Sequence, residues 1–106
     1  MTDKAVFLTT TASEAEASRI AYALVEQRLA ACVNIVPRVQ SIYRWRAKTE
    51  QAEEYLLLIK TSLELQEKVW NTIRSMHSYE VPEFVVLKIE GGSYEYLTWL
   101  AESLEK

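Results

Sequence analysis

The sequence is poor in cysteine, histidine and glycine, and each shortage excludes a class of structure. Its one cysteine, Cys32, cannot form a disulfide within the chain and fits a reducing compartment. One cysteine and one histidine, His77, do not supply the four closely spaced ligands of a structural zinc site. The two glycines are adjacent, at 91–92, and no repeat or low-complexity stretch indicates a linker. We therefore expect residues 1–106 to form a single domain.

The chain also lacks long apolar runs and an excess of positive charge. The apolar run LLLI at 56–59 is far too short to span a bilayer. The run AVFL at 5–8 is too short to be the core of a secretory signal. The net charge of −3 gives no overall attraction to nucleic acid or to an anionic membrane. We therefore expect a cytoplasmic protein that has neither nucleic acid nor membrane as a partner.

Apolar periodicity predicts seven elements in the order β-α-β-β-α-β-α. The expected strands are 4–10, 31–46, 54–61 and 83–90, and the expected helices are 11–30, a segment from about 62 to 76, and 93–106. Ser13 is a candidate N-cap with Glu16 three residues later, the spacing of a capping box, and Ser62 is a candidate N-cap for the second helix. Pro37 marks a bulge or an edge strand, and KTEQAE at 48–53 is typical of a polar turn.

The first six elements match the split βαββαβ, or ferredoxin-like, sandwich. In that α+β fold both helices cover one face of a four-stranded antiparallel sheet. The seventh element adds a C-terminal helix.

Two features of the strands are hard to fit into a monomer. Residues 31–46 would extend roughly 50 Å at ~3.3 Å per residue, whereas a compact chain of this length has a radius of gyration of about 13 Å. In addition, YLLLIK at 55–60 and FVVLKI at 84–89 are apolar on both sheet faces. We infer that a partner subunit covers the second face. The alternative is that a bulge at Pro37 folds the hairpin back and the C-terminal helix covers the rest.

His77 and Cys32 are the best donors for a soft or borderline metal ion. Met76 lies beside His77, but it also completes the apolar stripe of its helix, so core packing explains it better. Cys32 with His77 and a carboxylate is also the composition of a thiol enzyme. No sequence signature surrounds Cys32, and a strand interior favours an unreactive thiol. Acid–base chemistry by Glu80 and Glu83 has a simpler alternative, a solvated helix end, and we expect no catalytic residue.

The segment YRWRAK at 43–48 interleaves aromatic and basic residues, as single-strand nucleic acid binding requires. Strand alternation separates the two kinds of side chain, and acidic residues follow at once, so we expect no nucleic acid binding. A cleft for a small ligand is a further candidate, because aromatic walls with a few polar groups suit such ligands. Its alternative is ordinary packing at a subunit contact. The candidate cleft residues are Tyr43, Trp45, Lys60, Tyr79, Glu83 and Trp99.

Five segments, in their order and spacing, resemble the CutA family of divalent-cation tolerance proteins, and they extend over nearly the whole chain. They are LAACVNIVP at 29–37, SIYRW at 41–45, LLLIKT at 56–61, H-x-YEVPE at 77–83 and YLTWL at 96–100. The resemblance implies a single CutA-like domain and a homotrimer of ferredoxin-like subunits. Long hairpins then pack against neighbouring subunits as they do in PII signalling proteins. It also implies a non-enzymatic role in tolerance of divalent metal ions, with copper as the candidate ion and no required cofactor. By analogy with PII proteins, the clefts between subunits are candidate sites for a small ligand or a metal ion.

The resemblance carries over to individual residues. Cys32 matches the family's ACVN segment, and His77, Tyr79, Pro82 and Glu83 match its HPYE and PE segments. Trp45 and Lys48 match its W-x-G-K segment, and Lys60 its KT.

The chain also departs from the family at four positions. The family's usual glycine is Ala47 here, which is costly only where the turn needs a positive φ. Ser78 replaces its proline after the histidine, and Thr9 and Met76 occupy positions of further metal donors in some members.

Overall fold

The computed structural model describes residues 2–105, and within them the elements follow the expected order. They are β1 (Lys4–Thr11), α1 (Glu14–Glu26), β2 (Cys32–Trp45), β3 (Lys48–Ser62), a short 3₁₀ helix η1 (Leu63–Leu65), α2 (Gln66–Met76), β4 (Val85–Lys88) and α3 (Tyr94–Ser103). All strand pairs are antiparallel, and the sheet order is β2-β3-β1-β4. This order is that of the ferredoxin-like sandwich, so the predicted α+β fold is confirmed.

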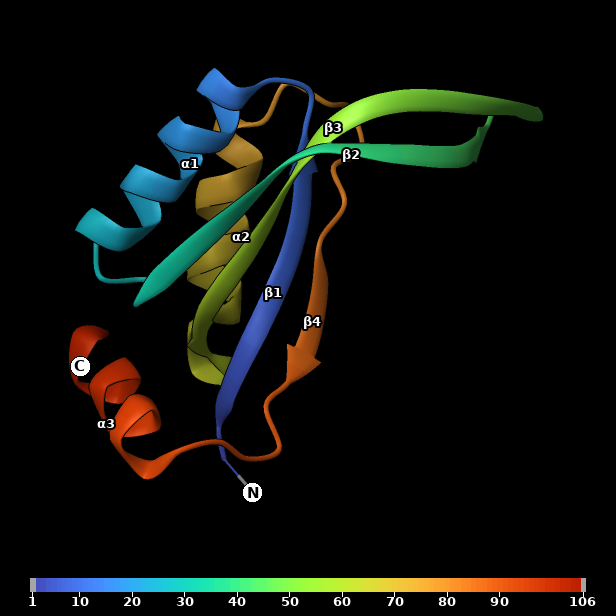
Figure 1. Ribbon diagram of the computed structural model, residues 1–106. Coiled ribbons are helices and arrows are strands. Elements are labelled where there is room, and N and C mark those ends of the chain that lie inside the picture. The colour runs from blue at the N-terminus through green and yellow to red at the C-terminus, as the bar shows by residue number, and fades with distance from the viewer. Residues whose placement is uncertain (1, 106) are drawn as a thin grey trace.

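The two faces of the sheet differ in what covers them. Helices α1 and α2 lie on one face (Figure 1), where Phe7 and its cross-strand partner Ile59 are fully buried. Val85 and Leu87 alternate to the opposite face and are 42% and 48% exposed. We call that opposite side the uncovered face. Its apolar residues are Val6, Leu8, Val36, Leu56, Leu58, Val85 and Leu87.

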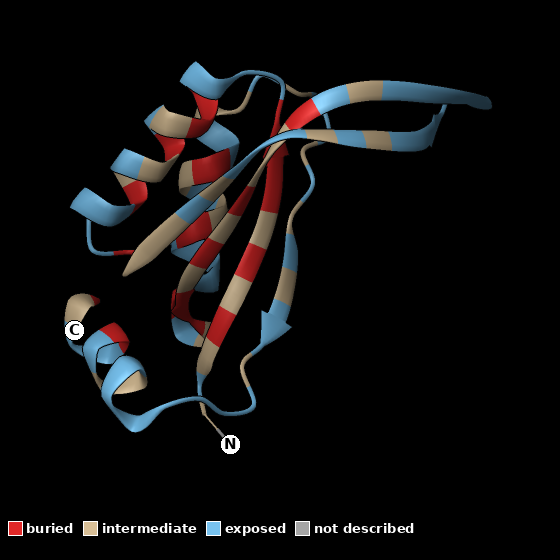
Figure 2. Ribbon diagram, in the orientation of Figure 1, coloured by how far each residue is buried: buried red, intermediate tan, exposed pale blue. Residues whose placement is uncertain are grey.

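The hairpin of β2 and β3 extends beyond the sheet as a projecting arm, residues 39–54, whose outer half is exposed (Figures 1 and 2). The pairing shifts between Val36 and Val39, and Arg38 has a φ of 59°, so the bulge expected at Pro37 is present. The longest dimension of the molecule is 44 Å, against a radius of gyration of 14.3 Å. The long strands therefore both bend and reach outside the compact part of the chain.

Three local expectations were wrong. Residues 48–53 belong to β3, and the turn is instead the pair Arg46–Ala47, with φ values of 50° and 68°. A two-residue turn with positive φ at both positions matches the twist of the strands that it joins. Ser62 stands at the N-cap position of η1 but makes no capping hydrogen bond with its side chain; its hydroxyl donates to the carbonyl oxygen of Asp3 at 3.3 Å. β4 is also shorter than expected and covers only Val85–Lys88.

Helix α3 lies at the end of the sheet away from the arm (Figure 1) and anchors itself through buried Leu100 and Leu104. The Arg28 side chain donates to the carbonyl oxygens of Glu102 and Ser103, at 3.1 and 3.2 Å, which satisfies the end of this helix. α3 therefore leaves Val85 and Leu87 on the uncovered face exposed. Within residues 2–105, no helix is long and apolar enough to cross a membrane.

Candidate functional site: an acidic, aromatic cavity below the arm

His77 lies at the corner between α2 and β4, as its sequence context predicts. It caps α2 with an extended backbone, and its side chain is fully buried. Nδ1 lies 3.1 Å from the backbone N–H of Tyr79 and 3.3 Å from Oε2 of Glu16. With Nδ1 assigned as the acceptor of the Tyr79 N–H, the ring proton is on Nε2. Nε2 then donates to the carbonyl oxygen of Thr10 at 2.6 Å. Both ring nitrogens are therefore engaged by the backbone, and His77 fastens this corner to the end of β1.

Glu16 holds the same corner from the helix side. Ser13 caps α1 by accepting the backbone N–H of Glu16 at 3.2 Å, as predicted. The reciprocal half of the expected capping box is absent, because the Glu16 carboxylate turns away from Ser13. It accepts the backbone N–H of Ser78 at 2.7 Å and the Ser78 hydroxyl at 2.9 Å. Ser78, which stands where the family has proline, thus supplies two hydrogen bonds that a proline cannot make.

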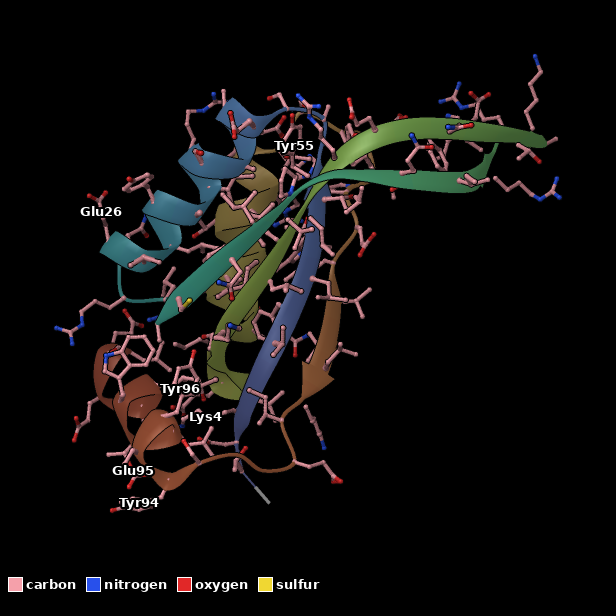
Figure 3. The ribbon with its side chains drawn as sticks, viewed as in Figure 1. Lys4, Glu26, Tyr55, Tyr94, Glu95 and Tyr96 are labelled. Atoms are coloured by element: carbon pink, nitrogen blue, oxygen red, sulfur yellow. The ribbon has the colours of Figure 1, made fainter. Side chains whose placement is uncertain are left out.

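A cavity of about 550 Å³ lies beside this corner, between the connection to β4 and the base of the arm. Its position follows from strand alternation, because Thr10 and Glu54 point to the same side of the sheet as Leu56. The cavity is therefore continuous with the uncovered face. Tyr55, next to Glu54, marks the point where the arm leaves the sheet (Figure 3). The lining residues are Thr10, Ser41, Ile42, Tyr43, Trp45, Glu54, Tyr79, Glu80, Val81 and Glu83.

Two of the lining carboxylates are those of Glu54, which is buried, and Glu83, which is exposed. Glu54 is 7% exposed, and its Oε2 accepts the hydroxyl of Tyr79 at 2.6 Å. Burial raises the pKa of the Tyr79 phenol, and the hydrogen bond to Glu54 raises it further, so Tyr79 stays a donor. Partial burial of the carboxyl group also raises the pKa of Glu83, with the negative charge of Glu54 as a second cause. Among the ion pairs of residues 2–105, none joins Glu54 or Glu83 to a lysine or arginine.

The arm supplies the aromatic wall. Tyr43 and Trp45 alternate to the same side of β2, as predicted, and both line the cavity. At the rim, the guanidinium of Arg46 lies 3.3 Å from the Glu80 carboxylate and 5.3 Å from the centre of the Trp45 ring. Both Arg46 and Glu80 are 73% exposed at their side chains, so this pair contributes little to stability.

The structure brings four of the six candidate cleft residues together, namely Tyr43, Trp45, Tyr79 and Glu83. Lys60 and Trp99 lie elsewhere. Lys60 is within the sheet, where its ammonium group donates to the side-chain oxygen of Asn34. Trp99 is on α3, at the end of the sheet away from the arm, together with the outward-pointing Tyr94 and Glu95 (Figure 3).

Cys32 is distant from His77. Cys32 pairs with Lys60, which pairs with Val6 of β1, whereas His77 bonds to Thr10, four residues along that strand. The separation along the strand is about 13 Å at ~3.3 Å per residue. In the described part of the chain, no three His, Cys, Asp or Glu side chains are close enough to hold one metal ion.

The candidate cleft left out two carboxylates that line the cavity, Glu54 and Glu80, although Glu80 was considered for acid–base chemistry. The sequence does indicate where the Glu54 side chain points. Glu54 is two residues from Leu56 and four from Leu58, so strand alternation places all three side chains on the same side of the sheet. Glu80 has no such indication, because it lies in an irregular connection without periodicity.

The fold, the projecting arm and the cavity define a ferredoxin-like α+β protein. The family model for the CutA1 divalent ion tolerance protein matches residues 5–103, and the chain belongs to this family.

Relatives support the assignment over most of the chain. The divalent-cation tolerance protein CutA of Thermus thermophilus is 50% identical over 92% of this chain and 95% of its own. The CutA of Pectobacterium atrosepticum is 42% identical over 96% and 93%. The solved structure of the Thermus thermophilus protein aligns with a TM-score of 0.94 at 48% identity, over 96% of this chain and 99% of its own.

Proposed function

We propose that this protein takes part in tolerance of divalent metal ions, as a non-enzymatic, cytoplasmic protein. The observation that carries the proposal is the family match over residues 5–103, together with relatives named for this role. The engagement of both His77 ring nitrogens by the backbone supports a non-enzymatic role, because neither is free to act as a base.

Growth of a host strain that lacks its own CutA protein tests the role. The strain should grow better at raised copper, cobalt or zinc with this chain than with an empty vector. Equal growth at every concentration would contradict the proposal.

A homotrimer is the second part of the proposal. The uncovered face presents Val36, Val85 and Leu87, and the outer arm presents Ile42 at 70% exposure. Apolar surface of this kind is typical of a subunit contact. We propose that neighbouring copies cover this face and that the arms pack across subunits in a PII-like arrangement.

Copper is the ion that we propose first, with His77 and Cys32 as donors in separate places. The chain's only imidazole and only thiol suit copper chemically. At His77, an ion can reach Nδ1 only when that nitrogen releases the Tyr79 N–H. Calorimetric titration of Cu(II) and Cu(I) should therefore show weaker binding in His77→Ala or Cys32→Ser than in the parent. Unchanged affinity in both variants would remove copper from the proposal.

A second candidate function is that of a small-ligand sensor that uses the cavity. The favouring observation is the convergence of Tyr43, Trp45, Tyr79 and Glu83 on one cavity of about 550 Å³, within the usual size range of ligand sites. The cavity adjoins the uncovered face, so a neighbouring copy packed there would border it.

A further inference from the structure

We propose that the cavity below the arm selects a planar organic cation, an amidinium or guanidinium group carried by a small molecule. This inference rests on the second candidate function above and adds the chemical class of the ligand.

The charge of the lining excludes an anion. Three carboxylates line the cavity, those of Glu54, Glu80 and Glu83, and no lysine or arginine is among the lining residues. Arg46 balances only Glu80, at the exposed rim. Two negative charges thus remain without an ion-pair partner among the described residues. One of them, on Glu54, is buried; it accepts a hydrogen bond from the neutral Tyr79 hydroxyl, whereas a buried charge normally also has a partner of opposite charge.

The spacing of the carboxylates disfavours a bare metal ion. A divalent cation requires several ligand oxygens within about 2.0–2.6 Å of one point. The described residues contain no group of three potential ligand side chains that meets around one such point. Carboxylates spread around a cavity of about 550 Å³ instead fit a cation whose charge is distributed over several atoms.

The aromatic wall selects a flat ligand. Tyr43, Trp45 and Tyr79 supply ring surface next to the carboxylates, a combination that favours a cation stacked on a ring and hydrogen-bonded at its edge. The chain already makes this pair of contacts at the rim. There the guanidinium of Arg46 stacks on Trp45 and pairs with Glu80.

Three probes of equal shape and different charge test the inference: benzamidine, which is a cation, benzamide, which is neutral, and benzoate, which is an anion. Each is titrated into the assembled parent protein by calorimetry. We expect benzamidine to bind at least tenfold more tightly than benzamide or benzoate.

Variants assign the binding to this cavity. Glu54→Gln and Glu83→Gln should each weaken benzamidine binding about tenfold or more, since each removes one uncompensated charge. Glu64→Gln changes an exposed carboxylate on η1 and should leave the affinity unchanged. Glu83 is exposed, so its variant stays informative if the buried Glu54→Gln does not fold. Trp45→Leu should weaken the binding of all three probes, because it removes aromatic stacking surface without changing the charge of the cavity.

The outcomes distinguish the proposal that the cavity binds a small ligand from the proposal that this ligand is a planar cation. Preference for benzamidine, lost in Glu83→Gln, supports both the cavity and its selectivity. Binding of benzamide or benzoate as tightly as benzamidine overturns the cation inference and leaves the ligand cavity standing. Absence of binding by all three probes at millimolar concentration overturns both, including the case in which a neighbouring copy fills the cavity.

Discussion

At the scale of single residues, Thr9 and Thr61 form a natural comparison on the helix-covered face of the sheet. Both are fully buried, but only the Thr61 hydroxyl has a partner, the carbonyl oxygen of Leu29 at 2.7 Å. The Thr9 hydroxyl has none among the described residues. A buried hydroxyl without a partner costs about 1–3 kcal/mol.

Thr9→Val should therefore raise the free energy of unfolding by about 1 kcal/mol, because it removes an unsatisfied group at nearly constant volume. Thr61→Val should lower it by about the same amount, because it removes a satisfied one. Urea denaturation measures both. Equal loss of stability in the two variants would show that the Thr9 hydroxyl is satisfied in solution.

Ala47 adopts a φ of 68° in the turn of the arm, a conformation that costs a residue with a Cβ atom about 1 kcal/mol. Ala47→Gly should therefore be neutral or stabilising by up to about 1 kcal/mol. Ala23→Gly, inside α1, is the matched control and should destabilise by about 0.5–1 kcal/mol. A loss of stability in Ala47→Gly as large as in the control would contradict the strained turn.

Glu83 has a carboxyl pKa raised from 4.5, so the folded state binds its proton more tightly than the unfolded state does. Ionised Glu83 therefore opposes folding at neutral pH, and this cost disappears as the pH falls through the raised pKa. Glu83→Gln should stabilise the protein at about pH 7 and have little effect at about pH 4. Because Glu83 is partly exposed, we expect a small gain. Thermal unfolding at both pH values measures this gain in stability. A larger gain at the lower pH would contradict a raised pKa for Glu83.

At the scale of elements, Glu16 ties the first turn of α1 to the connection between α2 and β4. Glu16→Ala leaves the backbone N–H and hydroxyl of Ser78 without their charged acceptor and removes a neighbour of the buried His77 ring. We expect a loss of about 2–3 kcal/mol in the free energy of unfolding. Glu14→Ala removes an exposed carboxylate from the same turn and should cost less than about 1 kcal/mol. Similar losses of stability in both variants would show that Glu16 stabilises the protein only through the dipole of α1 and not through its hydrogen bonds to Ser78.

Apolar periodicity predicted the elements wherever one face of them is buried. The order of the elements follows from that pattern. The Ser13 cap followed instead from its spacing to Glu16, and the bulge from Pro37. Apolar periodicity failed at residues 48–53, because the outer arm buries neither face and polar strands there cannot be distinguished from a loop. Ser62 makes no capping hydrogen bond, and its hydroxyl instead donates to Asp3, which is distant in the sequence.

The cavity was predictable in part for the same reason. Tyr43 and Trp45 share a strand face by alternation, and Tyr79 and Glu83 lie in a segment that the family resemblance singled out. Lys60 and Trp99 were grouped with them as amphipathic or charged residues near strand ends. The sheet register instead places Lys60 opposite Val6 and Cys32, and Trp99 lies on α3. Contacts between the arm and the connection to β4 depend on how far the arm bends, which the sequence does not encode locally.

At the scale of the whole molecule, the uncovered face should control assembly. Leu87→Arg places a charge among Val6, Val85 and their neighbours, and burial of that charge against a second copy is costly. Light scattering at micromolar concentration should give a trimer for the parent and smaller species for Leu87→Arg. Tyr22→Arg, on the exposed side of α1, should leave the trimer intact. If the parent protein is a monomer under these conditions, the proposed homotrimer is wrong.

If the proposed trimer forms, the exposed end of the arm reports whether its subunits are associated. A two-stranded hairpin with no cover is at best marginally stable in water, and residues 42–50 are exposed throughout in the single chain. Their backbone amides should therefore be protected from hydrogen exchange only while a neighbouring copy holds the arm, whereas the amides of β1 and β3 beneath α1 and α2 keep their protection in a separate subunit. On dilution, residues 42–50 should therefore lose protection from hydrogen exchange first. That loss would indicate dissociation of the subunits before any unfolding of the sheet.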